Sequence, residues 1–350
     1  MKHLVKNELG LYLCFVVGDQ QSYSRMTWLK RREPAGLEWV IPLPDDFHFI
    51  VHALMGTHFL WWPTLVRWVV LDVGVCPKTC GAGEHPEKWS SVEKYNNYRF
   101  LYELLIVSLM TYLRDAVPAG LLGNYPLLSR LASQNKGATV ILRFLYEYGL
   151  PWLSLRQSIR GRRSANIDLM WRMWLPIFRA CGKTLYSTLC VDTTYVSLAL
   201  HPPLQKIWSQ HQTCSLRGNP GRDMAWGQVQ EEANNVFKNG LGDGANRSSI
   251  DLFITRYNGI RDAEAKMRGI LGVPAREFDE DTVIEKADVE KIVAALKSKL
   301  PVNEFFSELS TNPFGSGAPW ENVEREKHTL RDYIVKNLNK PNFEMSSADW

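Results

Sequence analysis

The chain has 350 residues, of which 45% are hydrophobic and 22% charged, a composition typical of a folded protein with one large core or two modest ones. Its net charge of +4 is too small for a dedicated nucleic-acid-binding domain, so any basic surface must be local. Six cysteines spread over a long sequence without a signal peptide disfavour a secreted disulfide scaffold. We therefore expect an intracellular protein, nuclear or cytoplasmic.

Two strands with a helix between them are predicted near the start of the chain. The apolar run Leu11 to Val17 and the alternating run Leu37 to Leu43 are typical of strands, and Pro42 indicates an edge or a strand end. Ser22 to Arg32 has helical spacing, with basic residues in its last turn that suit the helix dipole. The expected order is strand, helix, strand.

From Phe47 to about His211 almost every segment has the periodicity of a helix. Clear examples are Asn97 to Leu113, Ala138 to Tyr148 and Asn166 to Phe178, the last with a candidate cap at Asn166. The apolar stretches Phe59 to Val75 and Leu101 to Leu113 are interpreted as core helices, because the first is interrupted by polar residues and the second is too short for a membrane span. No membrane association is expected, and the thirteen tryptophans are assigned mainly to helix packing.

The last third of the chain returns from this helical stretch. A glycine-rich turn around Gly218 leads into a predicted helix, Met224 to Lys238, which carries Glu231. Further helices are predicted at Asp288 to Lys299 and Asn322 to Leu338.

Acidic residues follow both predicted strands. Asp19 comes directly after the first strand, and Asp45 and Asp46 come after the second, with His48 two residues further on. Carboxylates held at strand ends are a common way to gather oxygen-loving metal ions for phosphoryl chemistry. The pattern therefore predicts a nuclease or transposase core.

The order of several short motifs resembles the eukaryotic domain-of-unknown-function 6589 family. The likeness spans about residues 10 to 270, and its motifs are Gly18-Asp19-Gln20, Trp39-Val40-Ile41-Pro42, Asp46-Phe47-His48, Leu216-Arg217-Gly218-Asn219-Pro220-Gly221-Arg222 and Glu231-Glu232-Ala233-Asn234-Asn235. Members of that family look like transposon-derived proteins similar to DDE transposases. The resemblance implies an RNase H-like sheet interrupted by a helical insertion before the last acidic residue.

The resemblance also implies roles for individual residues. Asp19 and Glu231 become catalytic metal ligands, and Asp46 with His48 becomes a further pair beside the second strand, together holding Mg²⁺ or Mn²⁺ for cleavage and transfer of DNA strands. Asp19 resembles the second acidic residue of such a site. The step from Asp19 to Asp46 cannot hold two strands and a helix, because strands take about five residues and helices about eleven.

Two explanations stay open for the missing first aspartate. Either the chain lacks the N-terminal strands of the core, which we favour, or Asp46 has become a ligand in a rearranged site. The expected fold is an α-rich α/β protein with an incomplete RNase H-like core. Its expected parts are a core remnant over residues 1–55, a helical insertion over 56–215, a returning glutamate helix over 216–272 and a charged, partly helical tail over 273–350.

Each candidate ligand also has a structural interpretation. Asp19, Asp45 and Asp46 suit helix N-caps, His48 suits a hydrogen-bonded structural role, and Glu231 suits a solvated helix face. Cys76, Cys80 and His85 provide three of the four ligands that a structural zinc ion needs, with His58 or Glu84 as the fourth, but their spacing matches no common zinc signature. Structural zinc is therefore not favoured.

Arginines are the candidate contacts to DNA phosphates, because guanidinium groups pair bidentately with phosphate oxygens. They are Arg156, Arg160, Arg162, Arg163, Arg217 and Arg222. The alternative to a transposase is a non-catalytic helical module that binds nucleic acid or protein, and a third interpretation is a structural protein with only a historical resemblance. An exposed edge of the short sheet would also favour self-association.

Overall fold

The computed structural model describes residues 13–75, 89, 94–215, 221, 223–231 and 284–338. The chain divides into two compact units, one made of residues 1–226 with 284–350 and the other of residues 227–283. Of the second unit the structure describes residues 227–231, which are helical.

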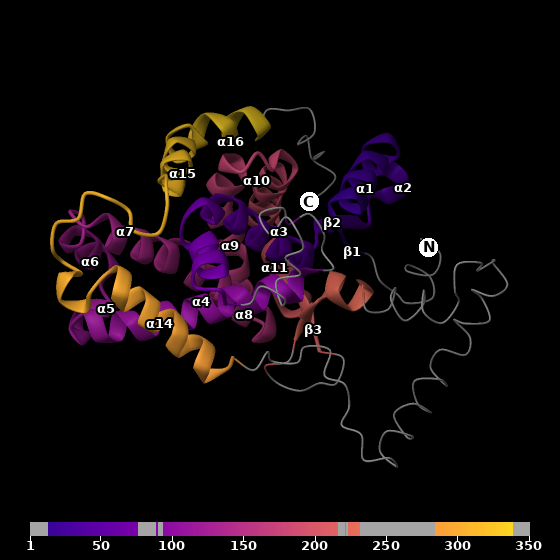
Figure 1. Cartoon of the computed structure of the whole chain (residues 1–350). Helices are drawn as coiled ribbons and strands as arrows, with labels where there is room; N and C mark the ends of the chain where they lie inside the picture. The colour runs from indigo at the N-terminus through magenta and orange to yellow at the C-terminus, as the bar shows by residue number, and fades with distance from the viewer. Residues whose placement is uncertain are drawn as a thin grey trace, which may run out of the picture. The chain divides into compact units, whose positions relative to one another are not determined.

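The first unit begins with a parallel β-α-β arrangement (Figure 1). Strand β1 (Cys14–Gly18) pairs in parallel with β2 (Val40–Pro44), in a register that runs from Cys14 opposite Val40 to Gly18 opposite Pro44. Helices α1 (Gln20–Arg32) and α2 (Pro34–Leu37) connect the two strands. The predicted order of strand, helix and strand is confirmed, although β2 begins three residues later than expected, because Pro34 starts a helical turn that includes Leu37.

A long series of helices follows the sheet. Its first members are α3 (Asp46–Trp61) and two π-helical segments, η2 (Trp62–Val66) and η3 (Trp68–Asp72). The next are α4 (Tyr95–Ala116), α5 (Ala119–Leu122), α6 (Tyr125–Leu131), α7 (Lys136–Arg143), the π-helical η5 (Phe144–Gly149) and α8 (Leu150–Arg160). The last are α9 (Ser164–Ala180), α10 (Thr184–Ala199) and α11 (Pro202–His211). The expected helical stretch is therefore confirmed for those of its residues that the structure describes.

A small antiparallel pair ends this series. Strand β3 (Thr213–Cys214) pairs with β4 (Met224–Ala225), so the predicted helix from Met224 begins at Trp226 instead. Residues 232–238 of that predicted helix lie outside the described residues. The α-rich fold with a short sheet is confirmed in this part of the chain, while its assignment as an incomplete RNase H-like core stays a prediction.

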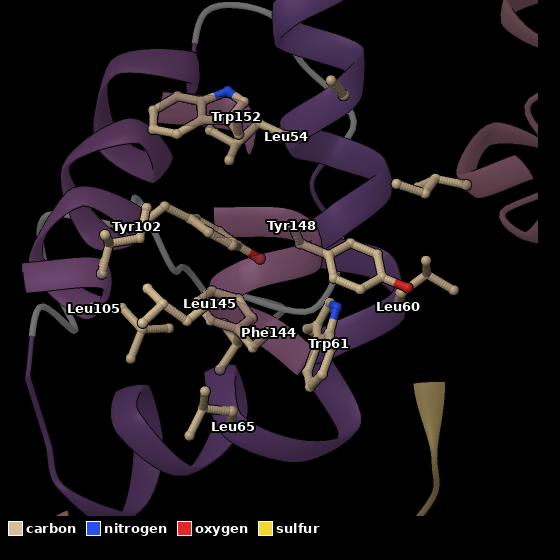
Figure 2. Close-up of a cluster of buried hydrophobic side chains, with 14 of the residues drawn as sticks. Leu54, Leu60, Trp61, Leu65, Tyr102, Leu105, Phe144, Leu145, Tyr148 and Trp152 are labelled. Atoms are coloured by element: carbon tan, nitrogen blue, oxygen red, sulfur yellow. The ribbon is translucent and has the colours of Figure 1, made fainter. Parts of the chain in front are cut away.

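Aromatic side chains form the centre of the helical core (Figure 2). Trp61 of α3 packs edge-on against Phe144 and Tyr148 of η5, with ring centroids 5.2 Å apart in both pairs. Trp152 of α8 and Tyr102 of α4 are also almost fully buried. The expected role of tryptophan in helix packing is confirmed at these positions, and large rigid rings supply much of the buried apolar area.

The C-terminal helices belong to the same core. Helix α14 (Lys286–Lys299) packs against α4 and is followed by η6 (Val302–Glu304), α15 (Pro319–His328) and α16 (Leu330–Leu338). Ile292 and Leu296 of α14 are fully buried, and Tyr112 of α4 donates a hydrogen bond to the Leu300 carbonyl at 2.8 Å. Residues 284–338 thus belong to the helical unit, and their helices lie in the segment 273–350 that was expected to be a charged, partly helical tail.

Helix α9 differs in detail from its prediction. It begins at Ser164 rather than at Asn166, because Arg163 and not Asn166 is its N-cap residue. Of the apolar residues at helical spacing, Met170 and Trp174 are buried, whereas Leu169 and Met173 are exposed.

One described stretch, Asp46–Val66, is long and apolar enough to cross a membrane by length and composition. Within it, 78% of the most apolar window is buried inside the protein. The stretch packs as the central helix of the core, which explains its apolar composition without a membrane.

Candidate functional site

Four polar residues gather where the two parallel strands end. Asp19 follows β1, and Asp45, Asp46 and His48 follow β2, while the Asp45 backbone N–H donates to the Gly18 carbonyl at 2.9 Å. We call these four residues the acidic edge. In open α/β sheets, ligands bind outside the carboxyl ends of the strands, so this edge is the natural place to look for a site.

Asp19 caps helix α1. Its Oδ1 accepts a hydrogen bond from the Ser22 backbone N–H at 2.7 Å. Partial burial raises the pKa of this carboxyl, but the hydrogen bond from Ser22 and the nearby His48 and Arg25 outweigh burial, so the net pKa is lowered. Asp19 is therefore an ionised carboxylate already engaged by the backbone, as its structural interpretation predicted.

Asp45 caps helix α3 and holds His48. Its Oδ2 accepts from the His48 backbone N–H at 2.9 Å and lies 2.8 Å from the His48 Nδ1. The Asp45 side chain is fully buried and that of His48 is 17% exposed. One carboxylate oxygen thus fixes both the start of the helix and the orientation of the imidazole.

Asp46 is the first residue of α3 and points into the interior. The residue is only 4% exposed, and its Oδ1 accepts a hydrogen bond from the Trp171 indole Nε1–H of α9 at 2.7 Å. Burial raises the pKa of Asp46 to about 8, helped by the negative charges of Asp45 and Asp168 and opposed by Trp171 and Gln212. At neutral pH this carboxyl is largely protonated, which makes it a poor ligand for a metal cation.

Three further residues lie against the acidic edge and were not expected from the sequence. Tyr186 of α10 stacks on His52 of α3 with ring centroids 4.0 Å apart, and Lys183 Nζ lies 3.3 Å from His52 Nδ1. Burial raises the pKa of Tyr186, and the charges of Asp45 and Asp19 raise it further. The spacing of His48 and His52, one helical turn apart, was an available signal for a shared face. Nothing local in the sequence connects α10 to that face.

The described residues do not fit the metal pair of a transposase. No group of three or more His, Cys, Asp or Glu residues in the described part of the chain could hold a metal ion. Within the edge, Asp45 and Asp46 are buried and bonded to protein donors, which leaves Asp19 as the one partly exposed carboxylate. Two-metal sites need several ionised carboxylates with free lone pairs.

Glu231, the other predicted catalytic ligand, belongs to the second unit and is half-buried there. Its pairing with Asp19 stays a prediction. The candidate zinc residues Cys76, Cys80, Glu84 and His85 lie outside the described residues. His58, one of the two residues suggested to complete that zinc set, is buried in the core, and its Nδ1 lies 3.3 Å from the Tyr102 hydroxyl.

The predicted phosphate contacts have separate environments. Arg156 is only 8% exposed and forms an ion pair with Glu103 of α4, so it is removed from the candidate DNA contacts, because a buried, paired guanidinium cannot reach a phosphate. Arg162 pairs with the buried Asp223 and has a φ of 55°, whereas Arg163 is exposed and Arg160 is half-buried. Arg217 and Arg222 lie outside the described residues.

Comparison of the chain with family models, with curated proteins and with solved structures gives no match. The resemblance to the domain-of-unknown-function 6589 family and to DDE transposases therefore stays a prediction that depends on the motifs quoted above.

Proposed function

We propose that the chain is a transposon-derived, DDE-transposase-like protein whose acidic edge stabilises the fold, and that it acts as a non-catalytic, helix-rich module that binds nucleic acid. The observation that carries the proposal is the set of partners at the edge. Asp19 bonds to the Ser22 N–H, Asp45 to His48, and Asp46 to the Trp171 indole. Each carboxylate thus has a structural role that a metal ion would have to displace.

The parallel β-α-β unit supports the transposase-like origin. Asp19 lies at the carboxyl end of β1 beside a parallel neighbour, the position that the motif Gly18-Asp19-Gln20 implies for a transposase aspartate. The turn between α8 and α9 supports the binding role, because it presents Arg163 to solvent with Arg160 beside it. Exposed arginines contribute to nucleic-acid affinity mainly through phosphate contacts.

Titration with Mn²⁺ tests the loss of metal chemistry. The thermal midpoint of the whole chain is measured with and without Mn²⁺, because a ligand that binds the folded state raises the midpoint. We expect no more stabilisation of the unsubstituted protein than of Asp19→Ala or Glu231→Ala. Stabilisation that disappears in both variants would overturn the proposal and favour the catalytic alternative, a metal-dependent DNA strand-transfer enzyme.

DNA binding is tested separately by fluorescence anisotropy with a labelled duplex at several salt concentrations. The double variant Arg160→Ala/Arg163→Ala is expected to weaken binding and to reduce its salt dependence, since each lost phosphate contact lowers the number of released counterions. Arg331→Ala in α16 is compared with the single variant Arg163→Ala, because both arginines are exposed and Arg331 lies on another helix. Equal binding by all these proteins would exclude this turn as the DNA contact.

A further inference from the structure

Helix α1 has an exposed face that is basic and carries an aromatic ring. Trp28 and Arg32 follow Arg25 by three and seven positions, so the three residues lie within about 60° of one another around the helix axis. All three are exposed, and Trp28, at 51%, is the most exposed of the tryptophans that the structure describes. Most of the other described tryptophans are buried or half-buried, so helix packing does not explain this ring.

The opposite side of α1 anchors the helix to the rest of the unit. Tyr23 is buried, and its hydroxyl donates to Asp192 Oδ2 of α10 at 3.1 Å. Met26 packs against the buried Val40 of β2, and Lys30 Nζ donates to the Val40 carbonyl at 2.8 Å. The exposed face is thus carried by a helix that the sheet and α10 hold in place, which suits a binding surface.

The charge of this helix is one-sided. The sequence Gln20–Arg32 contains three arginines and one lysine but no acidic residue. The acidic residues that flank it are Asp19, whose carboxylate caps the helix, and Glu33, which is exposed and therefore screened by water and salt. The helix dipole favours cations in the last turn, but it accounts neither for Arg25 in the middle of the helix nor for the ring of Trp28.

The Trp28 ring is already oriented by a cation. The Arg32 guanidinium lies over it, 4.8 Å from the ring centroid, in a cation–π contact that covers one face of the ring. Within the described part of the chain, neither Arg25 nor Arg32 forms an ion pair with a carboxylate. An exposed aromatic ring beside arginines is the arrangement that stacks on a nucleic-acid base while the arginines contact its phosphates.

Stacking on such a ring selects single strands. In a duplex each base is already stacked between its neighbours, so its face is closed to a side chain, whereas an unpaired base presents a free face. Arg25 and Arg32 are two helical turns apart, a rise of about 10 Å, with Trp28 between them. Both guanidinium groups can therefore reach phosphates on either side of a base that is stacked on the ring.

From this arrangement we infer that the exposed face of α1 binds single-stranded nucleic acid, with one base stacked on Trp28 and neighbouring phosphates contacted by Arg25 and Arg32. The inference rests on the proposed binding of nucleic acid, to which it adds a second surface and a preference for single strands. A membrane fits this face less well, because Trp28 and Leu29 are its only exposed large apolar side chains and an interfacial helix needs a broad apolar face.

Fluorescence anisotropy of the whole chain with three labelled probes tests the inference. The probes are a thymidine oligonucleotide, an abasic strand of the same length, which keeps the phosphates and lacks the bases, and a duplex. The thymidine strand is expected to bind about tenfold more tightly than the abasic strand. This ratio equals about 1.4 kcal/mol and lies within the range for one stacked base.

Substitutions on the exposed face separate the ring from the charges. Trp28→Ala should abolish the difference between the thymidine and abasic strands, whereas Trp28→Phe keeps a ring and should retain most of it. Phe59→Ala, which removes an exposed ring from α3, is the matched control and should bind like the unsubstituted protein. Arg25→Ala should weaken the binding of both strands alike and reduce its salt dependence, and Arg331→Ala in α16 should not.

A uridine strand and its deoxyuridine counterpart, which differ in the 2′-hydroxyl alone, separate the two sources of a single strand. Tighter binding of the uridine strand assigns the surface to RNA, because the 2′-hydroxyl distinguishes RNA from DNA. Equal or tighter binding of the deoxyuridine strand shows that the surface accepts single-stranded DNA.

The inference is overturned if the thymidine and abasic strands bind equally well, or if Trp28→Ala binds the thymidine strand as tightly as the unsubstituted protein does. Duplex binding that persists in either case leaves the proposed function standing without this surface, whereas no binding of any probe removes both. Binding to phosphatidylserine vesicles that depends on Trp28, without binding of the thymidine strand, would also overturn the inference and assign the face to a membrane.

Discussion

The indole Nε1 of Trp171 donates a hydrogen bond of 2.7 Å to the carboxyl of Asp46. The two residues are 125 positions apart in the sequence, and their hydrogen bond joins helix α9 to helix α3. It connects the end of the β2 strand to the centre of the helical core. Asp46 is buried, so the carboxyl depends on its protein partners rather than on water. The residue that the motifs suggest for metal binding is thereby fixed as part of the core.

Replacing Trp171 with phenylalanine should show how much this hydrogen bond contributes to the free energy of unfolding. The phenyl ring preserves the stacking on Phe49, whose centroid lies 3.8 Å from that of Trp171, but leaves the Asp46 carboxyl without its indole donor. We expect a loss of about 1 to 3 kcal/mol in the free energy of unfolding, measured by urea denaturation. Trp28→Phe on the exposed face of α1 is the control, and a loss as small as that control's would show that the bond contributes little.

The pH dependence of stability should report the buried Asp46 directly. Its pKa is raised from 3.8 to about 8 in the folded protein, so between about pH 4 and pH 8 the folded state binds a proton that the unfolded state has lost. Raising the pH through this window favours unfolding, by at most about 1.4 kcal/mol per pH unit. Asp46→Asn should remove this contribution, as measured by urea unfolding at several pH values. Identical pH profiles for the two proteins would contradict the raised pKa.

His52 should make the free energy of unfolding change with pH in the opposite direction, over an overlapping pH range. Burial, with help from Lys183 and His48, lowers the pKa of His52 from 6.5 to about 3. Between those values the unfolded state binds a proton that the folded state does not, so acidification favours unfolding. His52→Gln should therefore make stability less sensitive to acid between about pH 3 and pH 6.5. A variant as acid-sensitive as the unsubstituted protein would refute this assignment.

Local sequence signals predicted the start of the fold well, and distant contacts account for what they missed. The strands around α1 and the cap at Asp19 follow from patterns within about ten residues. The bond from Trp171 to Asp46, and the packing of Lys183 and Tyr186 against His52, depend on how α9 and α10 meet α3, which no local pattern encodes. Contacts between distant elements also explain what the sequence did not predict about the C-terminal helices. Their existence was predicted from periodicity, but the docking of Ile292 and Leu296 into the core was not.

Removing one partner of the buried ion pair between Arg156 and Glu103 should strongly destabilise the protein, whereas replacing both partners with apolar residues should destabilise it much less. Both side chains are 10% exposed, so Arg156→Met leaves the Glu103 carboxylate without this partner inside the protein. We expect a loss of about 3 to 5 kcal/mol for Arg156→Met and for Glu103→Met alone. The double variant should recover most of the loss, because two apolar side chains need no partner. A double-mutant cycle measured by urea unfolding checks this, and strictly additive losses would argue against direct coupling.

Gly315 allows the loop before α15 to lie close against the backbone of the π-helical segment η2. Its φ of +139° is a backbone angle that residues other than glycine rarely adopt, and a Cβ added there would lie 2.6 Å from the Pro63 carbonyl oxygen. The neighbouring Phe314 packs its ring against Trp68, with centroids 5.0 Å apart, so the loop cannot retreat without losing a buried contact. Gly315→Ala should therefore lower the free energy of unfolding by about 1 to 3 kcal/mol.

The matched control for Gly315 is Gly123→Ala at the end of α5. A Cβ there meets nothing within 4 Å, and the φ of −82° suits any residue. This substitution should be neutral or slightly stabilising, because alanine restricts the unfolded chain more than glycine does. Comparing the two variants by thermal unfolding separates the steric effect at Gly315 from the general effect of replacing a glycine. Equal midpoints would show that the loop can move away from Pro63, and that η2 does not depend on it.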